Sequence, residues 1–294
     1  MKKHLFLLIS IIVCLMSIGA TKLPFPVQGE YSGKIVNIGD DFFKPDFLLQ
    51  QANNAVLTDT KPDEIVIDPA IKLIQPKYGS ILLGDNDKRA FFLMDQDNDG
   101  YWMNFYLDQN QDYQISASEK IKSLEKWVPQ KIDKKWDLLE SSVTNDPIPM
   151  LVSYKGSQGE IRKKLSFYLW IKRFTRQGES EQTLVSFATA SSFEGFIKLL
   201  IGKDEKLVKF RITDGNCNGC FNDYGKDFLY LDLNFDGSFS KKEAVPLYEF
   251  FDQKAGKIST QMRLLIPACP LKIAVAPATE NYDTVHLEAP SDAF

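Results

Sequence analysis

The alternation of apolar and polar residues predicts a chain built mainly of β-strands. Residues 208–213 alternate strictly between apolar and polar side chains, the two-residue period of a half-buried strand. Residues 164–172 show the same alternation. Three short apolar runs, at 91–94, 105–107 and 228–231, are rich in aromatic residues, as strands are.

Helical periodicity is sparse. Residues 119–128 place Ile121, Leu124 and Val128 on one helical face before Pro129 ends the pattern. We therefore expect a mainly β fold with few short helices.

Two stretches of the chain are alike. The first runs from Gly79 to Asp108 and the second from Gly195 to Asp232, and each contains an apolar run, an Asp/Asn-rich turn with glycine, and an aromatic run that ends in aspartate. The offset between matching positions grows from 116 residues at the glycines to 124 at the last aspartates, as loop insertions would cause. The pattern predicts a duplicated unit of about 120 residues.

The predicted organisation follows from this repeat and from Pro-rich residues 141–149 between its halves. We expect a signal peptide at 1–20, a first β-rich unit at 21–145, a second at 146–276, and a loose C-terminal tail at 277–294.

Each predicted unit contains one full loop with the residue types that bind calcium. A calcium loop of twelve residues supplies oxygen ligands from positions 1, 3, 5, 7 and 12, with glycine at position 6 for a left-handed turn. The side-chain ligands would be Asp108, Asn110, Asp112 and Glu119 in the first full loop, and Asp232, Asn234, Asp236 and Glu243 in the second. Position 6 is Gly237 in the second loop but Tyr113 in the first, so we expect a strained turn and a weaker site there.

Two partial loops precede the full ones. Their ligands would be Asp95, Asp97 and Asp99 in the first partial loop, and Asp214, Asn216 and Asn218 in the second. Neither has an acid at position 12, although Asp223 or Asp227 would supply one nearby in the second. Polar turns without metal are the alternative, because Asp, Asn and Gly are ordinary turn residues.

These four segments resemble the calcium loops of the EF-hand superfamily, and more closely those of dockerin-like and other strand-entered variants. The resemblance covers the loops only, about a fifth of the chain. It departs from the paired-helix EF-hand because strands enter the loops and Pro246 ends the exiting helix, so helix-opening signalling is not implied. The duplicated strand–loop arrangement is similar to secreted bacterial β-rich proteins, from which no function transfers.

The N-terminus predicts export. Lys2 and Lys3 precede an apolar run at 5–18, and Gly19 and Ala20 offer a cleavage site. The run is shorter than the roughly 20 residues that span a bilayer, which argues against a permanent anchor. We expect a secreted or periplasmic protein without a membrane span after cleavage.

Charge and histidine content narrow the partners. Removal of residues 1–20 takes away two of 35 basic residues and none of 39 acidic ones. The net charge of the remaining chain is therefore 33 − 39 = −6. Such a chain is a poor nucleic-acid partner but suits divalent cations. His286 alone remains after cleavage, too little for a multi-histidine zinc site.

The cysteine pattern predicts a structural role for these residues rather than redox catalysis. Cys217 and Cys220 have the spacing of a redox pair, but they lie in a polar turn with no following helix to lower a thiol pKa. We expect one disulfide and one free thiol, with the local pair slightly favoured over a bridge from either residue to Cys269.

We therefore predict an exported, non-enzymatic Ca²⁺-binding protein with a structural or binding role, in which an extracellular polysaccharide or protein would be the further partner. The alternative is a secreted carbohydrate-active enzyme or carbohydrate-binding module stabilised by calcium. Its sugar-stacking candidates are Trp102, Trp127, Trp136 and Trp170. Tryptophan in strand-rich domains is more often part of the core.

Overall fold

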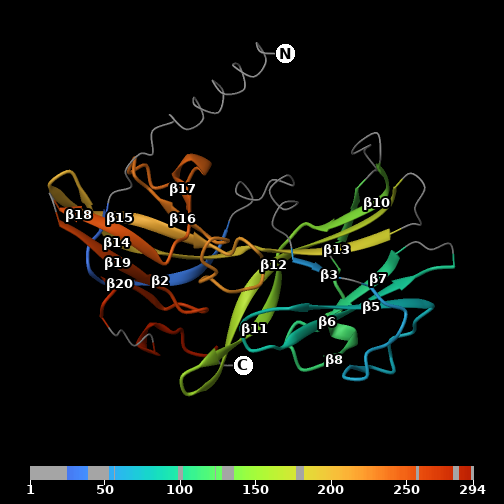
Figure 1. Ribbon diagram of the computed structural model, residues 1–294. Helices are drawn as coiled ribbons and strands as arrows, with labels where there is room; N and C mark the ends of the chain where they lie inside the picture. Colours follow the sequence, from blue (N-terminus) through green and yellow to red (C-terminus); the bar gives the residue numbers. More distant parts are fainter. Residues whose placement is uncertain are drawn as a thin grey trace, which may run out of the picture.

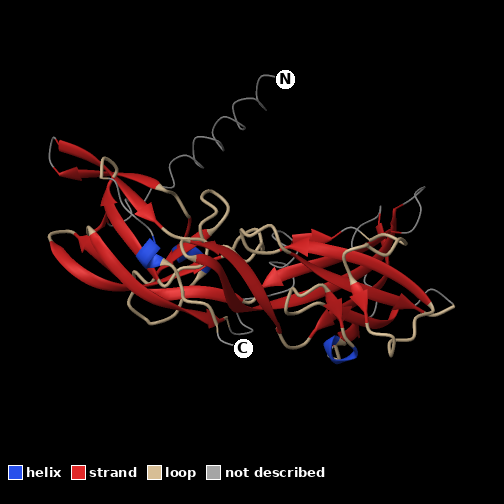
Figure 2. Ribbon diagram, turned by 90° about the horizontal axis from the view of Figure 1, so that it is seen from below, coloured by secondary structure: helices blue, strands red, loops and turns tan. Residues whose placement is uncertain are grey.

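The computed structural model describes residues 25–38, 53–55, 57–98, 102–122, 124–127, 136–176, 182–255, 258–280 and 285–292. The fold is mainly β, as predicted (Figure 2). The described helices are three short 3-10 turns: η1 (Ala117–Glu119), η2 (Lys241–Glu243) and η3 (Val285–Leu287). The predicted signal peptide lies outside the described residues, and no described helix is long and apolar enough to cross a membrane.

The larger sheet has nine strands and joins segments from both ends of the chain. Its order is β17-β16-β15-β14-β2-β20-β19-β18, and β1 also pairs with β14. The strands are β1 (Phe25–Pro26), β2 (Gly29–Asn37), β14 (Ser191–Ile201), β15 (Asp204–Thr213), β16 (Phe228–Leu231), β17 (Ala244–Pro246), β18 (Phe250–Ala255), β19 (Ile258–Leu265) and β20 (Lys272–Pro277).

A second sheet of six strands is centred on β12, which has 18 residues. The first half of β12 pairs with β11 and its second half with β10, so two strands share one of its edges. The strands are β3 (Asn53–Ala55), β9 (Leu124–Trp127), β10 (Trp136–Thr144), β11 (Ile148–Gly156), β12 (Gly159–Arg176) and β13 (Gln182–Thr189).

Two small sheets complete the described fold. A three-stranded sheet has the order β5-β6-β7, and β4 pairs with β8 in parallel. The strands are β4 (Val66–Ile67), β5 (Gln75–Leu82), β6 (Arg89–Gln96), β7 (Trp102–Leu107) and β8 (Gln114–Ile115).

One hydrophobic core connects the larger sheets with the three-stranded sheet. The Phe92 ring lies 5.3 Å from that of Phe105 and 5.8 Å from that of Phe187, and the rings of Phe193 and Phe210 are 5.7 Å apart. All five belong to the same buried cluster. Figure 1 shows β14, β15, β19 and β20 at one end of the molecule and β5, β6 and β7 at the other, with β11 and β12 between them.

The two stretches that are alike in sequence also share strand pairings. Gly79 lies opposite Phe92 between β5 and β6, and Gly195 lies opposite Phe210 between β14 and β15. In both places a Cβ on the glycine would come within 3.0 Å of the phenylalanine ring, which explains the residue type. The predicted boundary at 145/146 falls between β10 and β11, which both pair with β12. The division into two tandem units thus stays a prediction.

Two local predictions are wrong. The described residues after Glu119 in the range 119–128 form no helix: η1 ends at Glu119, and β9 pairs with the edge of β10. Described residues of the predicted loose tail are docked on the protein. Leu287 is fully buried, the Ala289 N–H donates to the Cys269 carbonyl, and the Asp292 N–H donates to the Arg162 carbonyl.

Candidate metal centre

The loops of the candidate metal centre begin where strands end. The first partial loop starts within β6 and the first full loop directly follows β7; the second partial loop directly follows β15 and the second full loop directly follows β16. Each full loop ends in a 3-10 turn, η1 or η2, and the chain then returns along the strand that entered. Tyr106 bridges to Lys120, and Tyr230 pairs with Ala244.

The second full loop is closed by hydrogen bonds to its first aspartate. Asp232 Oδ1 accepts from the Asp236 N–H at 3.1 Å, and Oδ2 accepts from the Gly237 N–H at 3.0 Å. Asn234 Oδ1 accepts from the same Asp236 N–H at 2.9 Å. Asp236 in turn accepts from the Ser238 N–H. These bonds orient the side-chain oxygens of positions 1, 3 and 5.

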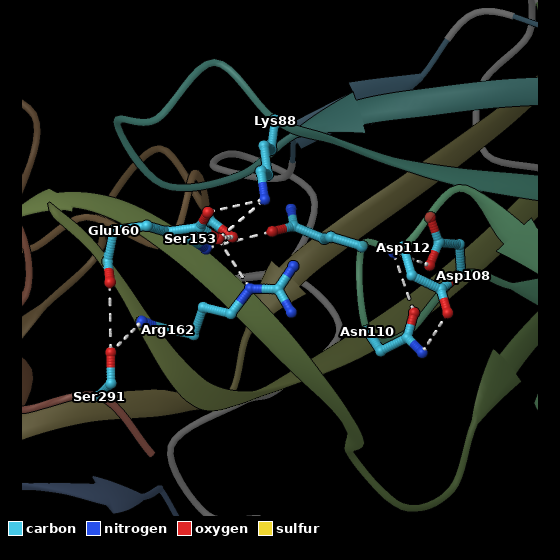
Figure 3. A network of polar contacts seen from close by, with 9 residues as sticks. Lys88, Asp108, Asn110, Asp112, Ser153, Glu160, Arg162 and Ser291 are labelled. Atoms are coloured by element: carbon cyan, nitrogen blue, oxygen red, sulfur yellow. Dashed lines mark hydrogen bonds and ion pairs between the residues drawn. The ribbon is translucent and has the colours of Figure 1, made fainter. Parts of the chain in front are cut away.

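The first full loop repeats this scheme. Asp108 accepts from the Asp112 and Tyr113 N–H groups, both at 3.1 Å, and Asn110 Oδ1 accepts from the Asp112 N–H at 3.0 Å. Figure 3 shows Asn110 and Asp112 turned toward each other in this loop. The loop is also anchored to β11, because Gln111 Oε1 accepts from the Ser153 N–H at 3.1 Å.

Tyr113 has the left-handed backbone that its position requires. Its φ is +66°, close to the +82° of Gly237 at the matching position. This conformation disfavours a residue with a Cβ. The Tyr113 ring packs edge-on against Phe91 with centroids 5.6 Å apart, and its carbonyl accepts from the Val66 N–H. Tertiary contacts thus hold the turn without glycine.

The two position-12 glutamates fold back onto their own loops but differ at one oxygen. Glu119 Oε2 accepts from the Ser116 N–H and Glu243 Oε2 from the Ser240 N–H, both at 2.9 Å. Glu119 Oε1 also accepts from the Gln109 N–H at 3.0 Å. Glu243 Oε1 is buried and has no hydrogen-bond partner among the described residues. A buried carboxylate oxygen without a donor fits a cation ligand.

The first and last predicted ligands of the first full loop are electrostatic neighbours. Burial raises the pKa of Asp108 to about 6; its two backbone hydrogen bonds oppose the shift, and the charges of Glu119 and Asp112 add to it. A divalent cation would relieve that repulsion and favour ionised ligands.

The second partial loop is completed by Asp227, two positions beyond the expected twelfth. Asp227 Oδ1 accepts from the Gly215 N–H and Oδ2 from the Asp223 N–H, both at 2.8 Å. Glu119 makes the matching bond to position 2 of its loop. Asp214 accepts from the Asn218 and Gly219 N–H groups, as the first aspartate of a full loop does. Asp227 therefore makes the bond that Glu119 makes in the first full loop, from two positions later and with a shorter side chain.

Three carboxylates gather around the second partial loop. Burial raises the pKa of Asp214 to about 6, and that of Asp227 to about 8 with a further contribution from Asp214. The third, Asp223, accepts from the side-chain amides of Asn216 (3.0 Å) and Asn218 (2.7 Å). Thr189, the last residue of β13, was not among the predicted site residues, and its hydroxyl donates to Asp214 at 2.5 Å. No sequence spacing signals a contact with so distant a strand.

The first partial loop is described only in part. Asp95 is 1% exposed, and its Oδ1 accepts from the Ile74 and Gln75 N–H groups, while Oδ2 has no partner among the described residues. Asp97 lies at its predicted position after β6, and Asp99 falls outside the described residues. Asp95 therefore stabilises the backbone of residues 74 and 75 in this arrangement.

Within the described residues, no three Asp, Glu, His or Cys side chains form a group arranged to hold a metal ion. Calcium loops also use Asn side chains and a backbone carbonyl, which are common to both full loops here. The loops thus contain the required oxygens, held mainly by their own N–H groups.

A charged cluster lies beside the first full loop. Glu160 accepts from Lys88 at 2.8 Å, Arg162 at 2.7 Å and the Ser153 hydroxyl at 3.0 Å, as Figure 3 shows. Burial acts to raise the pKa of Glu160, but these three donors together hold it at about 2. The cluster connects the loop between β5 and β6 to the β11–β12 hairpin, and two cations already compensate the Glu160 charge, so we assign it to structure.

The expected disulfide is not formed: Cys217, Cys220 and Cys269 are all buried free thiols. Cys217 packs with Ala188 and Trp170, whereas Cys220 and Cys269 belong to the main core. The turn thus directs its two cysteines to different clusters. Burial raises the pKa of Cys217 and Cys269 to about 12, which leaves little thiolate for redox chemistry.

The tryptophans do not form an exposed row within the described residues. Trp102 and Trp170 are partly buried, with the Lys172 ammonium 3.5 Å from the Trp170 ring, while the side chains of Trp127 and Trp136 are not described. Comparisons with known proteins add no assignment: no family model, curated protein or solved structure matches the chain.

Proposed function

We propose that the chain is an exported Ca²⁺-binding protein in which bound calcium has a structural or binding role. The observation that supports this best is the closure of the first full loop. Glu119 folds back to the residue beside Asp108, and its charge contributes to the raised pKa of that buried aspartate. A cation between the first and last ligands would remove this repulsion.

Both full loops would supply calcium with side-chain oxygens at positions 1, 3, 5 and 12 and a carbonyl at position 7, the ligand set of a twelve-residue calcium loop. The second full loop adds the buried Glu243 Oε1, which accepts from no donor among the residues that the structure describes. In the second partial loop, Asp214, Asn216 and Asn218 would supply a third ion together with either Asp223 or Asp227. We assign no catalytic residue.

Calorimetric titration of the metal-free protein with CaCl₂ tests the proposal. We expect binding in the micromolar to millimolar range typical of such loops, and weaker binding of Mg²⁺, which dehydrates reluctantly. Asp232→Asn combined with Asp108→Asn should remove both full-loop sites. Asp204→Asn, at the exposed first residue of β15, is the control that should bind as wild type.

Absence of heat and of any change in stability up to 10 mM calcium, about tenfold above the weakest such modules, would overturn the proposal. Binding that survives the double variant would instead move the site to the second partial loop, which Asp214→Asn then tests.

A further inference from the structure

A pocket of about 330 Å³ lies next to the first full loop, where β6, β7, β9, β10 and β12 meet the chain after η1. The volume is that of a small-molecule site. Apolar side chains, including those of Phe105 and Ile121, form part of the wall, and the polar residues are Trp102, Asn104, Lys120, Lys122 and Ser142. None of these residues is a candidate calcium ligand.

Trp102 contributes a hydrogen-bond donor that the described residues leave unused. Its indole Nε1 is buried and has no partner among the described residues. Buried indole N–H groups normally find an acceptor, and leaving one unpaired is costly. An acceptor atom bound in the pocket would satisfy it.

The charge of the pocket wall is positive. Lys120 and Lys122 are exposed side chains, and in the described part of the chain neither forms an ion pair. No acidic side chain is present among the residues that line the pocket. On a chain with a net negative charge, two unpaired lysines beside an apolar cavity favour an anionic ligand with an apolar body.

We propose that this pocket binds a small carboxylate whose body is a ring. The carboxylate interacts with the Lys120 and Lys122 ammonium groups, and an acceptor oxygen takes the Trp102 N–H. The ring packs against Phe105 and Ile121. Asn104 and Ser142 are placed to hydrogen-bond hydroxyl groups, so a uronic acid and an aromatic acid share the required chemistry.

The pocket is connected to the first full loop by backbone hydrogen bonds. The Ile121 N–H donates to the Phe105 carbonyl at 2.8 Å, so the strand that enters the loop and the chain that leaves it form adjacent walls. The proposal does not depend on calcium. Titrations in chelator and in calcium separate a failure of this site from a failure of the metal sites.

The test is to titrate the purified protein with galacturonate and, separately, with benzoate. Ligand-observed NMR monitors the binding in each titration. Each acid is paired with its neutral counterpart, galactose or benzyl alcohol. We expect at least one acid to bind about tenfold or more tightly than its counterpart, with affinity that falls as salt rises. If galacturonate shows this preference over galactose, the ligand is a sugar acid; if benzoate shows it over benzyl alcohol, the ligand is an aromatic acid.

The variants assign the binding to this pocket. Lys120→Gln with Lys122→Gln should weaken acid binding about tenfold or more, whereas Lys203→Gln, an exposed lysine in the β14–β15 turn, should have no effect. Trp102→Phe retains an aromatic wall but removes the N–H, and should weaken binding about fivefold. No binding of either acid at 10 mM, about the weakest affinity such a site would have, overturns the proposal, as does a double lysine variant that binds like wild type.

Discussion

The two full loops have the same backbone arrangement although they differ at the position that calcium loops reserve for glycine. Both hold positions 5 and 6 through the first aspartate, and both fold the last glutamate back to position 9. One has Tyr113 and the other Gly237 in the left-handed region. Glycine is therefore one way to hold this turn, and packing against the protein is another.

The surroundings of the loops explain this difference. In the first loop Gln111 is 1% exposed and anchors the loop to β11, and Tyr113 packs against Phe91. In the second loop Phe235, at the position that matches Gln111, is 49% exposed. A loop docked on the protein tolerates a strained residue because its neighbours restrain it, whereas a solvent-facing loop depends on intrinsic backbone freedom.

The largest effect that tests the comparison is stabilisation by calcium. At free calcium one hundred times the dissociation constant, each occupied site adds about 2.7 kcal/mol. For a chain of this size, one site should raise Tm by roughly 5–10 °C, measured by calorimetry in millimolar calcium and in chelator. Asp232→Asn should remove part of the increase and Asp108→Asn another part, since the loops differ in anchoring but share a ligand set. An unchanged Tm would mean that the similarity of the loops is only backbone geometry.

The next effect ranks the two sites. Glu243→Gln should weaken calcium binding more than Glu119→Gln, by about tenfold or 1.4 kcal/mol. The reason is that Glu243 Oε1 has no hydrogen-bond partner in the described part of the chain, whereas both oxygens of Glu119 already accept N–H groups. Calorimetric titration of the two variants measures the order.

Folding stability in chelator should show the opposite order. Glu119→Gln places an amide group against a backbone N–H and should cost about 1–2 kcal/mol more than Glu243→Gln. If the same glutamate proves more important for both calcium binding and folding, the comparison is wrong. Glu119 would then not serve mainly to hold its loop while Glu243 serves mainly to bind calcium.

Sequence periodicity predicted the strands well because each strand carries its own two-residue pattern. Residues 208–213 lie in β15, and the aromatic run at 228–231 is β16. It did not predict which strands are neighbours. β2 pairs with both β14 and β20, strands that follow it by more than 150 residues, and no local pattern records such a pairing. The helix expected at 119–128 was wrong for the same reason, since pairing with the edge of β10 decided that segment.

The candidate ligands were predictable to the extent that their spacing is local. Asp108 and Asp232 make the contacts expected of position 1, because an aspartate that accepts from N–H groups four and five residues ahead is a short-range feature. Asp227 was only one of two options, since it lies two residues beyond position 12. The Trp102 pocket had no sequence signal, because residues from five strands and from the chain after η1 line it.

The smallest effect concerns the turn residue itself and is measured by denaturant unfolding in chelator. Gly237→Ala adds a Cβ that would meet nothing within 4 Å, so its cost is conformational only, about 1 kcal/mol. Tyr113→Gly relieves about 1–2 kcal/mol of left-handed strain. It also loses the ring contact with Phe91, about 0.5–1.5 kcal/mol, and gives the unfolded chain additional freedom worth about 0.5–1 kcal/mol.

These opposing terms nearly cancel, so we expect Tyr113→Gly to leave folding stability unchanged or to lower it by up to about 1 kcal/mol. The consensus for calcium loops would instead predict a clear gain. Tyr113→Asn is the matched control, because asparagine adopts left-handed backbone more easily than most residues and also lacks the ring. A gain above about 1 kcal/mol for either variant would show that strain outweighs docking at Tyr113.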